Sequence, residues 1–249
     1  MEFIKFGIFL LVLVLNHKSQ AQFPSNIIER CVVHDNNCLK DAIQHVLKNY
    51  PTGVKQLGLR SIDPLKVEKL DINIGKNSPI NMNLNFKNTE LLGLSQSVIK
   101  SVTGFEKEIG SRIDIKGFTP TINLVGDYKI SGSILLVPVV GSGPSNITLT
   151  NTDYTLKFLP KLTTKNGKTY VEIEKCKLKL NTKRVHHNFS NLFNGDVVLG
   201  ENMNRIMNEN WELIWSNNQP AVEESMSYIM KNVLNDVFAT TSFDDLFSQ

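Results

Sequence analysis

The side chains that could carry chemistry in this chain are few, and they do not form a catalytic pattern. Two of the five histidines, His186 and His187, are adjacent in a segment expected to be extended, where neighbouring side chains point to opposite faces. No His-Glu-x-x-His or Cys-x-x-Cys sequence occurs, so no zinc site of those kinds is expected. Residues 93–97 lack the second glycine of a nucleophile elbow, and residues 141–144 precede a strand rather than the helix of a dinucleotide-binding loop. We therefore expect no enzyme, no metal and no cofactor.

The N-terminal residues have the composition of a secretory leader. Lys5 supplies a positive charge, and residues 6–15 form an apolar run that is too short for a bilayer, which needs about 20 apolar residues. Ser19 and Ala21 place small side chains at the two positions that signal peptidase reads. We expect cleavage after Ala21, an extracellular protein, and a single domain that spans residues 22–249.

Two of the three cysteines are close in sequence, and a secreted protein folds in an oxidising compartment. We therefore expect a disulfide between Cys31 and Cys38. By lowering the entropy of the unfolded chain it would stabilise the folded state by roughly 2.5 kcal/mol in the chain-entropy model. Cys176 is left without a partner. An odd cysteine can be intermolecular or reactive, but we expect a buried thiol that packs like a small apolar side chain.

The charge of the chain excludes several classes of partner. The formal net charge is +3 at pH 7, which gives no electrostatic case for a nucleic-acid partner. The densest group of lysines, in residues 175–183, alternates along a predicted strand and indicates a solvated strand face. No segment after the leader is apolar for long enough to cross a bilayer. We expect a monomer with no stable membrane insertion.

Two tripeptides have the sequence of an N-glycosylation acceptor, and such sites are used only where they are exposed. They are Asn146-Ile147-Thr148 and Asn188-Phe189-Ser190. Asn146 follows the turn-rich residues 141–144 and is the better candidate of the two.

The elements that must position these residues are predicted by the spacing of apolar side chains. Residues 37–49 form one helix, because five apolar side chains fall on one face, and Pro51 and Gly53 end it. From residue 64 onward the period is two. The clearest run is in residues 80–86, where apolar side chains alternate with Asn81, Asn83 and Asn85, so this strand is expected to have a dry face and a wet face.

Further strands are predicted by the same alternation, at residues 70–74, 112–118, 121–129, 131–140, 147–159 and 170–180. We expect turns at residues 126–127, 131–132, 141–144 and 166–167, the last being an Asn-Gly pair that suits a two-residue hairpin. The alternation shifts in the last strand, so we expect a bulge near Glu174 and Lys175 that places all its apolar residues on one face. These strands predict a long antiparallel meander.

The chain ends in helix over residues 201–238, with Pro220 expected to end or kink it. A single helix of this length would extend for roughly 57 Å at 1.5 Å per residue. A compact domain of this size has a radius of gyration of only about 17 Å. We therefore expect an elongated α+β domain in which a strongly curved antiparallel sheet wraps around the long C-terminal helix.

Several segments resemble the insect takeout and haemolymph juvenile hormone binding protein family over nearly the whole chain after the leader. The most specific are Phe189 to Asp196, which contains Leu-Phe-Asn-Gly, and Asn208 to Trp211, of sequence Asn-Glu-Asn-Trp. The others are Cys31 to Cys38 with the helix after it, Ile62 to Leu65, Tyr128 to Gly132, Leu136 to Gly143, and Met203 with Asn204. The hormone-binding members usually carry a second disulfide, so the unpaired Cys176 places this chain nearer the takeout branch.

The resemblance implies a long helix wrapped by a curved sheet around an apolar tunnel for hormones or other lipids. We expect the tunnel wall to include Met82, Leu84, Phe86, Trp211, Trp215 and Met226. The predicted function is a secreted carrier of a hydrophobic small molecule, such as a terpenoid, a fatty acid or its ester, or a quinone. The alternative is a secreted interaction or signalling protein whose tunnel is vestigial or filled by a constitutive lipid.

Overall fold

A computed structural model of the protein describes residues 27–74, 80–104 and 111–248. The leader and its cleavage site lie outside these residues. Seven strands form one antiparallel sheet in the order β2-β3-β5-β6-β7, with β4 also paired to β5 and β8 to β6. The elements are β1 (Cys31–Val32), α2 (Asn36–Asn49), β2 (Leu65–Ile74), β3 (Ile80–Leu92), β4 (Val98–Thr103), β5 (Ile113–Ile134), β6 (Val137–Lys165), β7 (Lys168–Asn181), β8 (Arg184–Phe189), α3 (Val197–Glu209), α4 (Trp211–Thr240), α5 (Phe243–Leu246) and β9 (Phe247–Ser248), with single 3-10 turns at Lys55–Leu57, Leu94–Gln96 and Phe193–Gly195.

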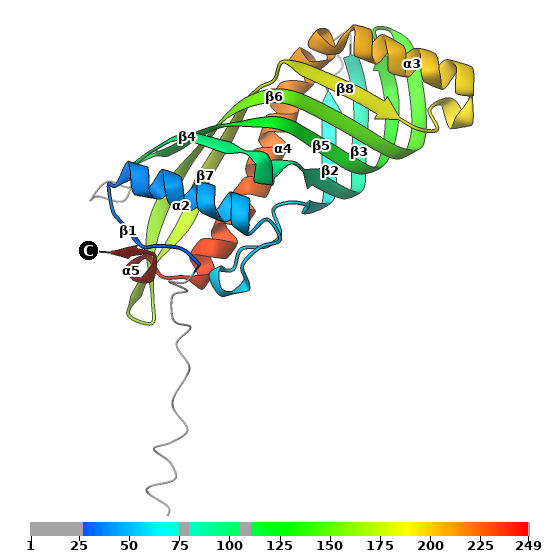
Figure 1. Cartoon of the computed structure of the whole chain (residues 1–249). Coiled ribbons are helices and arrows are strands. Elements are labelled where there is room, and N and C mark those ends of the chain that lie inside the picture. The colour runs from blue at the N-terminus through cyan, green and yellow to red at the C-terminus, as the bar shows by residue number, and fades with distance from the viewer. Residues whose placement is uncertain (1–26, 75–79, 105–110, 249) are drawn as a thin grey trace, which may run out of the picture.

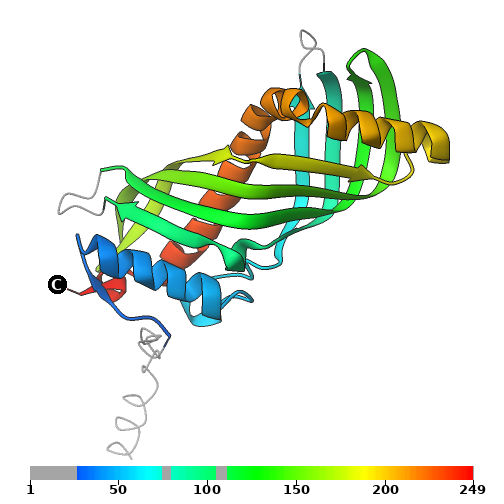
Figure 2. The ribbon, with the colours of Figure 1, turned by 45° about the horizontal axis from the view of Figure 1, so that its top comes forward.

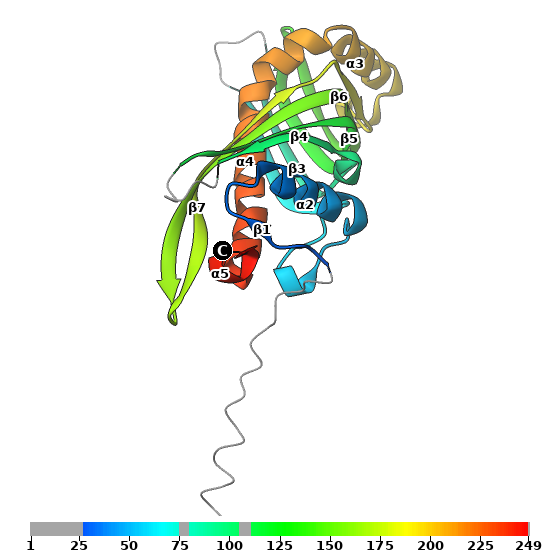
Figure 3. The ribbon, with the colours of Figure 1, turned by 60° about the vertical axis from the view of Figure 1, so that its left-hand side comes forward.

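The sheet is strongly curved, and α4 runs along its inner side, as Figures 1 and 3 show from two directions. This helix contacts β2 and β7, the two outer strands of the order, so it closes the open side of the curved sheet. The shorter helix α2 covers the end of the sheet that lies near β1 and α5 (Figure 1). The predicted α+β architecture, a long C-terminal helix wrapped by a curved antiparallel sheet, is confirmed.

The two central strands are much longer than predicted. β5 has 22 residues and β6 has 29, and the predicted turns at residues 126–127, 131–132 and 141–144 are wrong because these residues pair inside continuous strands. The glycines at these positions instead allow a neighbouring segment of backbone to pack closely. A Cβ at Gly132 would collide with the carbonyl oxygen of Asn81, and one at Gly141 would lie 2.9 Å from the Cα atom of Leu192. The actual β5–β6 turn is Leu135-Leu136, with φ values of 49° and 68°, whereas the predicted Asn166-Gly167 hairpin is confirmed.

The strand faces follow the predicted alternation. Met82, Leu84 and Phe86 in β3 are at most 3% exposed, while the asparagines between them lie on the other face. The predicted bulge in β7 is confirmed, since the pairing with β6 shifts at Glu174. It places five side chains of β7 on the inner face, namely Val171, Ile173, Cys176, Leu178 and Leu180.

The C-terminal helical region breaks at Asn210 rather than at Pro220, so the predicted position of the break is wrong. Asn210 leaves helical geometry, with φ −107° and ψ 28°, and its side-chain amide donates to the carbonyl oxygen of Ile206. Pro220 lies inside α4, which continues past it as a helix of 30 residues. Figure 2 shows that the axes of α3 and α4 differ in direction on the two sides of this break, and that α3 lies across the sheet near β8. The missing N–H of this one proline is tolerated because α4 is buried against the sheet both before and after it, for example at Ile214 and Met226.

A polar stripe on α4 pairs with the free edge of β7. The stripe consists of every fourth residue, namely Gln219, Glu223, Ser227, Lys231 and Asn235, and these side chains bond to the backbone of Leu180, Leu180, Leu178, Glu174 and Ile173 in that order, at 2.7 to 2.9 Å. Four helical residues rise about 6 Å, close to the length of two strand residues, so one face of the helix can follow a strand edge. The stripe therefore takes the place of a further strand.

The other helices complete strand edges in the same way. On α3, Asn204 pairs with both backbone groups of Phe189, and Asn208 pairs with both groups of His187. On α2, Gln44 accepts from the N–H of Ile99 and donates to the carbonyl of Ser97 in the β4 region. Exposed strand edges are prone to pairing with other chains, so these amides both seal the edges and fix each helix to the sheet.

Cys31 and Cys38 form a disulfide that joins β1 to the start of α2. Cys176 is free, and it is half-buried rather than fully buried as predicted. Burial raises the pKa of its thiol to about 11, so the group is protonated and unreactive near neutral pH.

Thiol counting on the denatured, non-reduced protein should give one free thiol per chain. Three free thiols, or a dimer linked through Cys176, would contradict this assignment.

Candidate ligand-binding cavity

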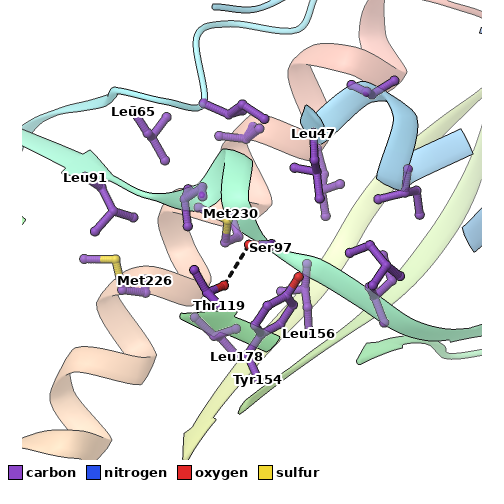
Figure 4. Close-up of a pocket in the computed structure, with 18 of the residues that line it drawn as sticks. Leu47, Leu65, Leu91, Ser97, Thr119, Tyr154, Leu156, Leu178, Met226 and Met230 are labelled. Atoms are coloured by element: carbon purple, nitrogen blue, oxygen red, sulfur yellow. Dashed lines mark hydrogen bonds between the residues drawn. The ribbon is translucent and has the colours of Figure 1, made fainter. Parts of the chain in front are cut away.

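An internal cavity of about 430 Å³ lies between the inner face of the sheet, α4 and α2. Its wall consists mainly of leucine, isoleucine, valine and methionine side chains from these elements, and Figure 4 shows several of them pointing into the space. A cavity of this size is within the range of pockets that take small molecules. Ordinary protein cores do not leave such a space unfilled.

Helix α2 contributes its whole predicted apolar face to the cavity wall. The five residues are Leu39, Ala42, Ile43, Val46 and Leu47. The helix is held in place by the disulfide at its start and by the two hydrogen bonds of Gln44 to the β4 region. The helical period therefore predicted the correct face, and the face contacts empty space as well as neighbouring side chains.

Helix α4 contributes two of the predicted tunnel residues, Trp215 and Met226, which both line the cavity. Trp211 does not lie on the cavity wall. It is half-buried at the start of the helix, with the guanidinium group of Arg184 5.5 Å from its ring centre. The break at Asn210 accounts for this difference, because Trp211 is the first residue after it.

The predicted tunnel residues of β3 lie on the inner face but not on the cavity wall. Met82, Leu84 and Phe86 are buried in the main core cluster and do not line the cavity, although Ile72 and Leu70, the cross-strand partners of Leu84 and Phe86, do. Side chains from α3 and the start of α4, including Met203 and Met207, belong to the same core. The alternation correctly predicted which face these residues occupy, but it carries no information on how closely another element packs against that face.

A small hydroxyl cluster interrupts the apolar wall. The hydroxyl oxygens of Ser97 and Thr119 are 2.7 Å apart, and both side chains are at most 4% exposed. The Tyr154 side chain lines the cavity beside this pair. Burial raises the pKa of Tyr154, and a side-chain interaction with Ser97 offsets only part of that rise. The three hydroxyls, which Figure 4 shows together, are neutral at physiological pH and can bind an uncharged oxygen atom.

Charged groups are nearly absent from the cavity wall. Among the residues that the structure describes, Glu29 is the one carboxylate on the wall, and its side chain is also exposed to solvent. No described group of three or more histidine, cysteine, aspartate or glutamate side chains is arranged to hold a metal ion. An ionised ligand placed in this cavity would lose its hydration without gaining a charged partner, which is unfavourable.

The remaining predicted sites lie on the outside of the molecule or away from the cavity. Asn146 in β6 and Asn188 in β8 are both exposed. His186 is exposed and His187 is buried, as expected for neighbours in a strand, and burial lowers the pKa of His187 to about 4. Among the described helices, none is long and apolar enough to span a membrane.

Sequence and structure comparisons give a consistent result. Residues 8–248 match the family model for haemolymph juvenile hormone binding protein. The circadian clock-controlled protein daywake of Drosophila melanogaster is 24% identical over 233 residues, which cover 91% of this chain and 89% of daywake, and daywake of Drosophila yakuba is 23% identical over 240 residues, which cover 94% and 92%. The crystal structure of Epiphyas postvittana Takeout 1 superposes with a TM-score of 0.75 at 22% identity, and it covers 89% of this chain and all of that one.

Proposed function

The chain belongs to the haemolymph juvenile hormone binding protein family, and from this premise we propose that it is a secreted, monomeric carrier of one hydrophobic small molecule. The observation that carries the proposal is the internal cavity with its apolar wall. A role as a ligand carrier is favoured over a role as an enzyme, because the cavity wall offers no nucleophile paired with a base and the described residues form no metal site. Secretion rests on the leader in residues 1–21, with cleavage after Ala21.

The ligand class follows from the chemistry of the wall. The long apolar surfaces suit an extended hydrocarbon chain, and burial of that chain provides affinity at about 25 cal/mol per Å² before ordering costs. The hydroxyl cluster of Ser97, Thr119 and Tyr154 suits one uncharged oxygen atom along the chain. We therefore propose a neutral terpenoid, ester or quinone as the ligand, in preference to the ionised form of a fatty acid.

The proposal is tested by displacement of a fluorescent lipid with a series of neutral esters and the matching carboxylates. We expect the ester to bind at least tenfold more tightly than the carboxylate of equal chain length, a difference of about 1.4 kcal/mol. Calorimetry should show a negative heat-capacity change and little dependence on salt, as burial of apolar surface without ion pairing requires. Equal or tighter binding of the carboxylates would contradict the proposed ligand class.

A bulky substitution in the cavity should reduce binding of long ligands most. Leu178 lies on the cavity wall in β7 (Figure 4), so Leu178→Trp is expected to weaken the longest ester at least tenfold and short esters less, because the new ring occupies part of the space. Leu162 in β6 is 40% exposed and lies away from the wall, so Leu162→Trp is the matched control. Equal effects of the two variants would show that the ligand does not occupy this cavity.

The alternative function, a secreted interaction protein with a permanently filled tunnel, is distinguished by mass spectrometry of an organic extract. A carrier should release lipid that exchanges for added ligand. Lipid that is present but does not exchange, or the absence of both lipid and displacement, would favour the interaction protein.

A further inference from the structure

The two glycosylation tripeptides, far apart in sequence, lie side by side in the fold. Asn146 of β6 and Asn188 of β8 are direct cross-strand partners in an antiparallel pair. Directly opposed residues of such a pair leave the same face of the sheet, with Cβ atoms about 4.5 to 5.5 Å apart. Both asparagines are exposed, so each is sterically accessible when the other is unmodified.

The surroundings of this pair suit a sugar. The row that contains the two asparagines continues to Val125 of β5, an apolar side chain that is 39% exposed. The next row contains Asn123, Thr148 and His186, with the Thr148 hydroxyl donating to the Asn123 side-chain oxygen at 2.8 Å. Beyond Val125 the first row continues to Glu90 of β3, whereas the second row continues from Asn123 to Leu92, so the residues directly beside the two asparagines are uncharged. The first sugar of a glycan could cover Val125 with its apolar face and hydrogen-bond to the neutral amides around it.

The packing of β8 fixes the direction of the Asn188 side chain. Val185, His187 and Phe189 alternate with Asn188 and are buried on the opposite face. The free edge of β8 is held by Asn204 and Asn208 of α3. Once β8 pairs with β6, Asn188 therefore points outward beside Asn146, at a spacing close to the width of one sugar ring. Two branched glycans would have to leave this point in parallel and would crowd each other.

From this arrangement we infer that Asn146 and Asn188 act as one N-glycosylation locus that carries a single glycan, on Asn146 when both acceptors are present. Asn146 is synthesised first, and its strand pairs locally with β5. Asn188 follows later and is confined when β8 docks beside the modified residue. It becomes the acceptor when Asn146 is not modified.

The transfer itself needs only what the secretory pathway supplies. The side-chain amide nitrogen attacks the anomeric carbon of an oligosaccharide carried on a lipid pyrophosphate. The bond from that carbon to the pyrophosphate oxygen breaks, the amide loses one proton, and no group is oxidised or reduced. The inference therefore rests on the secretion proposed above, but it does not depend on the ligand.

The experiment is to count and map glycans on protein recovered from the medium of insect cells. Intact mass is measured before and after enzymatic removal of N-glycans, for the unaltered chain and for Thr148→Ala, Ser190→Ala and the double variant, each of which keeps both asparagines. We expect one glycan on Asn146 in the unaltered chain and in Ser190→Ala, one on Asn188 in Thr148→Ala, and none in the double variant. Asn146→Gln should repeat the shift to Asn188 without altering Thr148.

Two outcomes on the secreted protein would overturn the inference. Two glycans on the unaltered chain would show that the sites are independent, and an unmodified Asn188 in both Thr148→Ala and Asn146→Gln would show that it is not an acceptor. A chain that stays inside the cells with residues 1–21 attached would instead refute secretion, and this inference with it. That failure is recognised by the retained leader rather than by the glycan count.

Discussion

Replacing Leu84 by aspartate is expected to lower the free energy of unfolding by about 3 to 5 kcal/mol. Leu84 is 3% exposed in the middle of β3, and its cross-strand partners Ile72 and Ile130 are equally buried. The new carboxylate would enter an apolar core that offers it no cation and few donors. It would remain ionised and unpaired or would be protonated at a similar cost. Urea denaturation followed by circular dichroism measures the change.

The matched control is Asn83→Asp, at the neighbouring residue on the exposed face of the same strand. This variant introduces the same functional group without burial, so a change within about 0.5 kcal/mol is expected. If the two variants unfold at the same urea concentration, the inner and outer faces of β3 are assigned the wrong way round. Since Leu84 does not line the cavity, ligand affinity should be unchanged in any Leu84 variant that remains folded, such as Leu84→Met.

Replacing Glu223 by alanine is expected to cost about 2 to 4 kcal/mol of stability, although glutamate is ordinarily a surface residue. Glu223 is 4% exposed and accepts hydrogen bonds from the backbone N–H of Leu180 at 2.9 Å and from Lys179 and Gln219. Alanine would leave the N–H of Leu180 buried without an acceptor and would loosen α4 from the edge of β7. Glu224→Ala, which removes an exposed carboxylate from the next position, is the control and should have little effect.

The same carboxylate should make the stability of the protein depend on pH. Burial alone would raise the pKa of Glu223, but the hydrogen bonds from Lys179, Leu180 and Gln219 outweigh it and hold the pKa below the ordinary value. A lowered pKa means that the stabilisation is fully present above the pKa of the unfolded chain and is lost as pH falls through the folded-state pKa. Unfolding curves below about pH 4.3, the usual glutamate pKa, should therefore fall more steeply for the unaltered protein than for Glu223→Ala. Parallel curves would show that Glu223 does not contribute through its charge.

The periodic spacing of apolar residues was sufficient to predict most of the elements and their faces. The alternation in β3 and the shifted alternation in β7 predicted the inner residues and the bulge, and the helical spacing in α2 predicted one apolar face, which the structure places on the cavity wall. These patterns are local consequences of a period of two in strands and 3.6 in helices. They are therefore present in the sequence without knowledge of the partner element.

Local turn signals were less reliable because glycine has more than one use. Glycines at three predicted turns lie inside β5 and β6, where the curved sheet brings a neighbouring backbone close to them. The true turn is Leu135-Leu136, whose residue types do not favour positive φ. Pro220 likewise signalled a break that the structure places at Asn210. In each case packing outweighed the local preference.

The sequence by itself determined which faces of the strands and of α2 point inward, and it carried the resemblance to the juvenile hormone binding protein family. Only the tertiary structure decided where the interior is filled and where it is empty. Phe86 and Trp215 both carry large aromatic side chains in the same core cluster, yet Trp215 lines the cavity and Phe86 does not. The same holds for the polar stripe on α4, which resembles a solvated face until β7 is placed beside it. The physical reason is that side-chain periodicity records the direction of each residue, whereas a cavity or a sealed strand edge depends on the distance to another element.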